Sequence, residues 1–195
     1  LEEMLGADLV QAALRRIEAQ LAVRTAATDV DANLWLKVDS FAMLQAIASL
    51  AARLVEEFEV KLVQLRLQPV EGDASRAHLD LIWNGQVMST ETVMSWESSP
   101  MTVGNEANPL SVRDVVERHG GEFWFQRERT RHEAFFRFLL PLAQAQDQLD
   151  ASALMHSDSR PEYYDFDLFR ASEETRAMDD RRLVELAYTV FDTET

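Results

Sequence analysis

The chain has 195 residues, 47% of them hydrophobic and 27% charged, a composition that supports one globular core with or without a tail. It contains no cysteine, which excludes disulfides and thiolate metal sites. The formal net charge of -15 disfavours contact with a nucleic-acid backbone, and the apolar runs are too short to cross a bilayer. We therefore expect a cytoplasmic fragment without direct nucleic-acid or membrane contact, and any membrane anchor would lie upstream in the parent chain.

Apolar spacing predicts two amphipathic helices in the first third of the chain. Residues 8–20 show one apolar face, and short strands are expected at 21–25 and 34–38 on either side of a polar turn. The second helix spans 39–58 and has the widest apolar stripe, which begins at Phe41.

Alternating apolar residues then predict a β-hairpin made of strands 60–68 and 77–83. A short helix follows at 90–95. The stretch 97–108 contains proline and glycine and is expected to be a loop.

The last part of the compact region predicts one more helix and one more hairpin. Residues 112–119 have a helical face that ends at two glycines, and strands are expected at 122–127 and 134–140. This order of elements predicts an α+β fold, a two-layer sandwich with helices packed on one face of a mixed, mostly antiparallel sheet.

Two segments carry a family resemblance. LSVRDVVERHGGEFW, at 110–124, resembles the last helix and strand of histidine-kinase ATPase domains, and FFRFLLP, at 135–141, resembles their closing strand. Residues 39–58 stand where that family has its asparagine-box helix, and 82–87 where it has its first glycine box. The resemblance implies a Bergerat (GHKL) ATPase-like domain over 1–142.

The residues at the family's ligand positions differ from what nucleotide binding requires. The resemblance implies asparagines on the second helix for magnesium and an aspartate for the adenine amino group. Ser49 and Arg53 stand at the asparagine positions, and a guanidinium has no acceptor for a cation. Trp83 stands at the aspartate position, and an indole nitrogen can only donate a hydrogen bond.

The glycine boxes are also depleted. Gly85 stands in the first box, but Val87 replaces a glycine there. In the second box only Gly104 remains, and Glu106 adds negative charge where phosphates would lie. We therefore expect a degenerate pocket without ATP or another cofactor, and a non-catalytic regulatory or scaffold module. The alternative is an ATP-binding, sensor-kinase-like domain with an unusual pocket.

The histidines indicate neither a phosphoacceptor nor a metal site. His78, His119, His132 and His156 are isolated from one another in the sequence. His119 ends a helical pattern, and we expect it to cap that helix.

An acidic linker is expected at 143–182. Ten acids and three arginines lie between Asp147 and Asp180, and the segment 161–169 interrupts the acids with large apolar residues. We expect this aromatic segment to dock on the ATPase-like domain or on a following domain, which also leaves open a peptide- or protein-binding module.

The segment LVELAYTVFDTET, at 183–195, resembles the opening strand of DEDD-family 3′–5′ exonucleases, which include the proofreading epsilon subunit of DNA polymerase III. Asp192 and Glu194 lie two residues apart, so they point to the same side of a strand. The resemblance implies that both acids bind Mg²⁺ in a complete exonuclease. The alternative is an acidic chain end that matches by chance.

These expectations imply a parent protein that is an exonuclease and a fragment that is not an enzyme. The expected partners are the adjoining exonuclease domain and an upstream sensor region of the same chain, and a homodimer is a further option.

Overall fold

The computed structural model describes residues 1–85 and 87–143. In chain order the elements are β1 (Glu2–Leu5), α1 (Gly6–Gln20), β2 (Arg24–Val30), β3 (Trp35–Val38), α2 (Ser40–Phe58), β4 (Leu62–Val70), β5 (Asp73–Asn84), α3 (Thr90–Ser98), β6 (Pro100–Val103), β7 (Glu106–Ser111), α4 (Val112–Arg118), β8 (Glu122–Glu128) and β9 (Glu133–Pro141). The expected exonuclease strand, and the expected linker apart from Ala143, lie outside the described residues.

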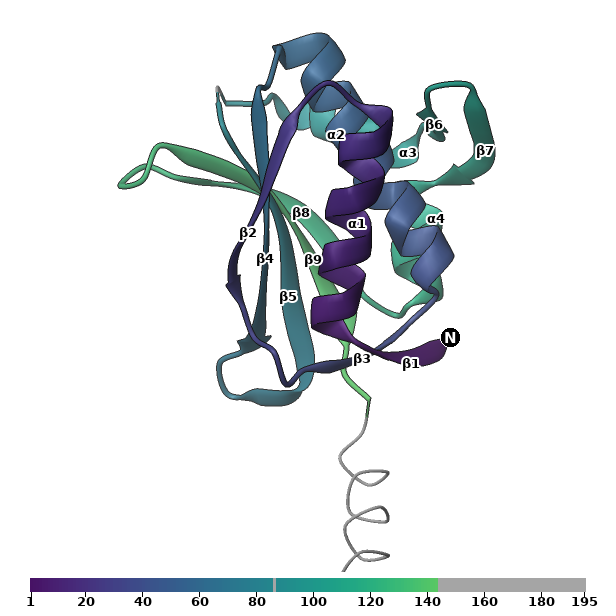
Figure 1. Cartoon of the computed structure of the whole chain (residues 1–195), viewed down its shortest axis with the longest axis vertical. Helices are drawn as coiled ribbons and strands as arrows, with labels where there is room; N and C mark the ends of the chain where they lie inside the picture. Colours follow the sequence, from purple (N-terminus) through teal and green to yellow (C-terminus); the bar gives the residue numbers. More distant parts are fainter. Residues whose placement is uncertain (86, 144–195) are drawn as a thin grey trace, which may run out of the picture. The chain divides into compact units, whose positions relative to one another are not determined.

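A five-stranded sheet forms one layer of the domain, with strand order β2-β4-β5-β9-β8. β2 runs parallel to β4, and all other neighbours in this sheet are antiparallel. The helices lie on one side of the sheet (Figure 1). This confirms the predicted two-layer α+β sandwich and both predicted hairpins.

The core lies between the helix layer and the inward face of the sheet. The inward positions of β5 (Leu79, Leu81 and Trp83) are 0–2% exposed, because they alternate along a strand that the helices cover. Apolar surface buried in this way stabilises the fold by about 25 cal/mol per Å². Phe41 differs from its prediction, because at the first turn of α2 it is 62% exposed and lies outside the core.

The two strands after α1 do not pair with each other as a hairpin. β2 pairs with β4, and β3 pairs with β1 in a separate two-stranded sheet. The N–H of Gly6 donates to the carbonyl of Leu34 at 2.7 Å, and a Cβ at Gly6 would lie 2.3 Å from a methyl carbon of Leu67. Glycine therefore allows the start of α1 to lie directly against β4 and the β2–β3 connection.

The predicted loop at 97–108 is wrong, because most of it forms the β6–β7 hairpin, which extends from the helix layer (Figure 1). Its turn places Gly104 at φ 58°, a conformation that glycine adopts without strain. Met101 and Val103 are buried, so the hairpin adds to the core. Its residues alternate over only four to six positions, too few to distinguish a strand from a loop by sequence.

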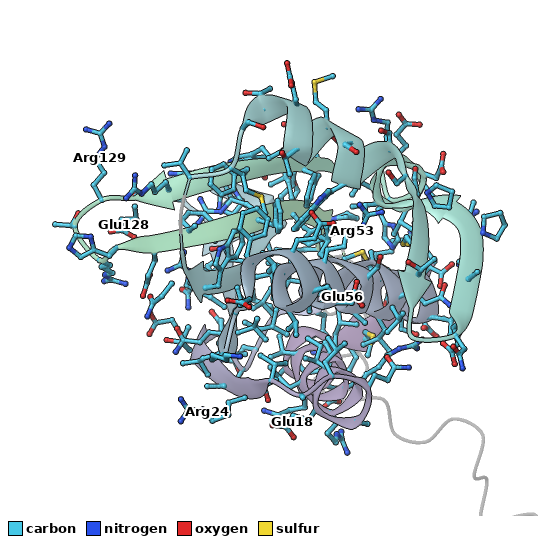
Figure 2. The ribbon with its side chains drawn as sticks, turned by 90° about the horizontal axis from the view of Figure 1, so that it is seen from above. Glu18, Arg24, Arg53, Glu56, Glu128 and Arg129 are labelled. Atoms are coloured by element: carbon cyan, nitrogen blue, oxygen red, sulfur yellow. The ribbon has the colours of Figure 1, made fainter. Side chains whose placement is uncertain are left out.

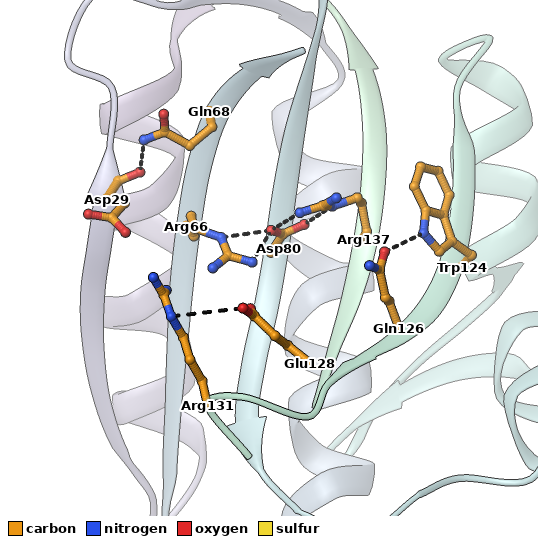
Figure 3. A network of polar contacts seen from close by, with 9 residues as sticks. All are labelled: Asp29, Arg66, Gln68, Asp80, Trp124, Gln126, Glu128, Arg131 and Arg137. Carbon is orange, nitrogen blue, oxygen red and sulfur yellow. Dashed lines mark hydrogen bonds and ion pairs between the residues drawn. The ribbon is translucent and has the colours of Figure 1, made fainter. Parts of the chain in front are cut away.

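The outward face of the sheet carries a row of side chains in register across four strands. Arg66 on β4 pairs with Asp80 on β5, Asp80 with Arg137 on β9, and Arg137 with Trp124 on β8. Figure 3 shows both guanidiniums directed at the one carboxylate. The closest contacts are 2.8 Å from Arg66 and 2.7 Å from Arg137. The pairing allows Asp80 to be 1% exposed, since a buried carboxylate needs opposite charge and hydrogen bonds.

His78 lies on the same outward face and should make stability depend on pH. Partial burial, followed by the positive charge of Arg137, holds the pKa of His78 below its ordinary value of 6.5. Below that pH the unfolded chain takes up a proton that the folded chain resists, so the free energy of unfolding falls as pH decreases.

We expect the wild-type protein to lose more stability between about pH 7.5 and pH 5.5 than His78→Gln, measured by urea unfolding at each pH. His132→Gln is the control, because His132 lies in the exposed β8–β9 turn. Equal losses in wild type and His78→Gln would contradict the assignment.

Candidate functional site

The residues that the sequence places in a nucleotide pocket belong mainly to one corner of the domain. Ser49 and Arg53 lie on α2, Trp83 lies near the end of β5, and Gly85 directly follows that strand. Ser49 is 2% exposed. The guanidinium of Arg53 lies over the ring of Trp96 on α3, 5.8 Å from its centroid, and Figure 2 shows Arg53 on the α3 side of α2.

The side chain of Trp83 is enclosed in this corner. It is 2% exposed, and its ring centroid lies 4.9 Å from that of Phe136 and 6.0 Å from that of Phe125. These distances are typical of aromatic pairs that stabilise a core. A Cβ at Gly85 would lie 2.4 Å from the indole nitrogen of Trp83, so glycine leaves the space that the indole uses.

Further rings continue the cluster from Trp83 toward α2. Trp96 on α3 lies 6.0 Å from Phe136 and 5.6 Å from Phe58, the last residue of α2. Phe123 stacks on Phe136 at 5.3 Å. Side chains from the sheet, α2 and α3 therefore pack together in this corner. Their aromatic rings have no carboxylate oxygen that could accept a hydrogen bond from an amino group.

The β6–β7 hairpin contacts α2 in its N-terminal half. The side-chain amide of Asn108 donates to that of Gln45, one helical turn before Ser49. Arg16 on α1 forms an ion pair with Glu106 at 3.0 Å. Exposed ion pairs contribute little, but together with the buried Met101 and Val103 these contacts tie the hairpin to both helices.

Two of the predicted site residues lie away from this corner's packing. Val87 follows β5 and is 59% exposed. Gly104 is at the tip of the β6–β7 hairpin, where a Cβ would meet nothing within 4 Å. Asp192 and Glu194 lie outside the described residues, and residues 1–85 and 87–143 hold no group of three side chains suited to a metal ion.

A hollow of about 450 Å³ lies between the C-terminal end of α2 and the end of β5. Its lining residues are Glu57, Phe58, Glu59, Val60, Asn84 and Gly85. It contains two carboxylates and no cationic side chain, but an adjoining hollow of about 340 Å³, which shares Phe58, Glu59, Val60 and Asn84 with it, is also lined by Arg24 and Lys61. Neither Ser49 nor Arg53 lines the larger hollow.

His119 joins the end of α4 to the start of α2. The backbone N–H of Asp39 donates to Nε2 of His119 at 2.8 Å, so the ring proton is on Nδ1, which lies 2.6 Å from the carbonyl oxygen of Val115. Asp39 is also the N-cap of α2 and accepts from the N–H of Ala42. His119 therefore caps its helix as predicted. Its link to Asp39, eighty positions away, has no signal in the sequence.

Solved structures with the same fold include histidine-kinase domains. The chain is 14% identical to the ATP-binding domain of PrrB from Mycobacterium tuberculosis, with a TM-score of 0.56 over 73% of this chain and 98% of that one. The chain is 14% identical to the histidine-kinase domain of the E. coli osmosensor EnvZ, with a TM-score of 0.54 over 73% of this chain and 89% of that one. It is 14% identical to the mycobacterial sensor histidine kinase MprB, with a TM-score of 0.50 over 72% of this chain and 98% of that one. At this identity the likeness shows the fold, which is that of the GHKL (Bergerat) ATPases.

Comparison of the sequence with described protein families and with curated proteins finds no significant match. In the described part of the chain, no helix combines the length and apolar character that crossing a bilayer requires.

The contact between Trp83 and Gly85 can be tested by a double-mutant cycle. Gly85→Ala should reduce the free energy of unfolding by about 1–3 kcal/mol, because the new methyl group displaces the indole. In a Trp83→Ala background the same change should cost much less, because alanine has no ring atoms for the new methyl group to meet. Urea unfolding followed by circular dichroism measures both. Equal costs in the two backgrounds would show that the glycine is not needed for the indole.

Proposed function

We propose that this domain is a non-catalytic regulatory or scaffold module that keeps the Bergerat fold without its nucleotide chemistry. The observation that supports this most strongly is the enclosed indole of Trp83, at the position where the family resemblance implies a base-binding carboxylate. An adenine ring entering there would have to displace Trp83 from its contact with Phe136.

The magnesium side of the pocket supports the same proposal. Ser49 is buried, and Arg53 brings a positive charge to the helix that would hold the cation. The hairpin that follows α3 is fastened to α2 at Gln45 by Asn108. A nucleotide site would therefore lack its base acceptor and its cation ligand, and losing both costs several kcal/mol of binding free energy.

Calorimetric titration of the chain with a non-hydrolysable ATP analogue and Mg²⁺ tests the proposal. We expect no saturable heat up to about 1 mM nucleotide, a limit that corresponds to about 4 kcal/mol of binding free energy. The ATP-binding domain of PrrB, measured under the same conditions, controls for nucleotide quality.

The competing function is an ATP-binding domain with an unusual pocket, in which Trp83 stacks on the base. Micromolar binding that is lost in Trp83→Ala and kept in Trp35→Ala would establish that function and reject ours. Trp35 is a suitable control because it lies on β3 and is 44% exposed.

We further propose that the module regulates a 3′–5′ exonuclease in the parent chain, because the sequence around Asp192 and Glu194 resembles the opening segment of that family. In the intact parent protein, Asp192→Ala should abolish Mg²⁺-dependent release of nucleotides from the 3′ end of a labelled strand. Deleting residues 1–142 should change how the activity is controlled while leaving the single-turnover rate of cleavage unchanged. No Mg²⁺-dependent cleavage by the intact protein would reject the exonuclease.

A further inference from the structure

Three ionised side chains on the outward face of the sheet, those of Arg66, Asp80 and Arg137, form an ion triad with a net charge of +1. Arg66 and Arg137 share the single carboxylate of Asp80. Among the described residues, no other carboxylate lies within 4.0 Å of either guanidinium. The carboxylate is saturated. Its Oδ2 accepts from both arginines, and its Oδ1 accepts from Nε of Arg137 at 2.7 Å.

The surplus charge is only partly accessible to water. The side chains of Arg66 and Arg137 are 12% and 19% exposed, because both guanidiniums also lie over the ring of Phe135, 5.1 and 4.8 Å from its centroid. Two like charges held close together in a partly dry setting repel one another more strongly than they would in water. Each guanidinium has five N–H donors, so both keep donors that Asp80 does not use.

The side chains next to the triad offer an aromatic ring and amide groups to an extended peptide. Trp124 continues the row beyond Arg137, and its ring lies 5.9 Å from that of His78, edge to face. Gln64, Gln68 and Gln126 flank the row on β4 and β8. The amide nitrogen of Gln68 donates to the carbonyl of Asp29, and the amide oxygen of Gln126 accepts from the indole of Trp124, so the amide of Gln64, the oxygen of Gln68 and the nitrogen of Gln126 are the groups that can bond a peptide backbone. Figure 3 shows Trp124, Gln126, Arg137 and Arg66 spread across this face, with the helices on the far side of the sheet.

We propose that this face, defined by Arg66, Asp80, Arg137 and Trp124, binds an acidic peptide segment of a partner protein. One carboxylate of the peptide accepts from the free donors of the two arginines, and a neighbouring apolar side chain packs on Trp124. Charge complementarity favours this occupant, because one surplus positive charge matches one carboxylate. A single charge does not match the many phosphates of a nucleic-acid strand, which need several cations.

The net charge of the chain does not oppose this contact at physiological salt. The Debye length is about 8 Å at 0.15 M, so acids elsewhere on the surface are largely screened, whereas the half-buried guanidiniums are screened much less. This inference is independent of the proposed loss of nucleotide chemistry, because the sheet's outward face is opposite the helices that form the nucleotide corner.

The test uses the full chain and a fluorescein-labelled octapeptide of alternating glutamate and tyrosine, with binding followed by fluorescence anisotropy at 0.15 M salt. We expect saturable binding that is weakened at least about tenfold by Arg66→Gln, which leaves Asp80 paired with Arg137 and removes the surplus charge. Trp124→Ala should weaken binding as well. Unfolding curves of each variant show whether it remains folded.

Two controls make the result specific. Arg76→Gln removes an exposed arginine that pairs with Asp73 at the start of β5 and should leave affinity unchanged. A peptide of alternating glutamine and tyrosine should not bind. The proposal is overturned if the acidic peptide fails to bind the wild-type chain, if Arg76→Gln weakens binding as much as Arg66→Gln, or if a thymidine dodecamer binds more tightly than the peptide.

Discussion

The contact between Trp83 and Phe136 is the interaction on which the packing around Trp83 depends. Both side chains are almost completely buried, and through Phe136 the indole is linked to Trp96 and so to α3. Buried aromatic side chains contribute large areas of apolar surface, and removing one costs roughly 3–5 kcal/mol. The cluster therefore contributes much of the stability of this corner.

The core of this Bergerat fold extends into the hairpin that follows α3. Here the β6–β7 hairpin adds Met101 and Val103 to the interior and is fastened to α1 and α2 by polar contacts. Ligand-binding regions are usually among the less stable parts of a domain, because they must open. In this chain the rings of Trp83, Trp96 and Phe136 pack together in the corresponding region.

The two faces of the sheet serve different purposes. The inward face follows the simple alternation of apolar residues and forms the core. The outward face buries a carboxylate between two guanidiniums, which is a costly arrangement unless every partner is in place. Because Arg66, Asp80 and Arg137 come from three strands in register, the triad also favours the native register over slipped alternatives.

The sequence by itself determined the fold class and the extent of most helices and strands. Periodicity is a local property, so the stripe of α2 and the alternation of β4, β5 and β9 are visible without any contact information. The order of elements and the His119-Gly120-Gly121 segment were enough to predict a two-layer sandwich of histidine-kinase type.

Only the tertiary structure decided which distant segments meet. It paired β2 with β4 and β3 with β1, turned the expected loop after α3 into a hairpin, and moved Phe41 out of the core. It also brought Arg137 to Asp80 and His119 to Asp39, across 57 and 80 positions of the chain. The physical reason is that side-chain identity sets what each residue can bind, whereas strand register and helix packing, which depend on the whole chain, set what lies within its reach.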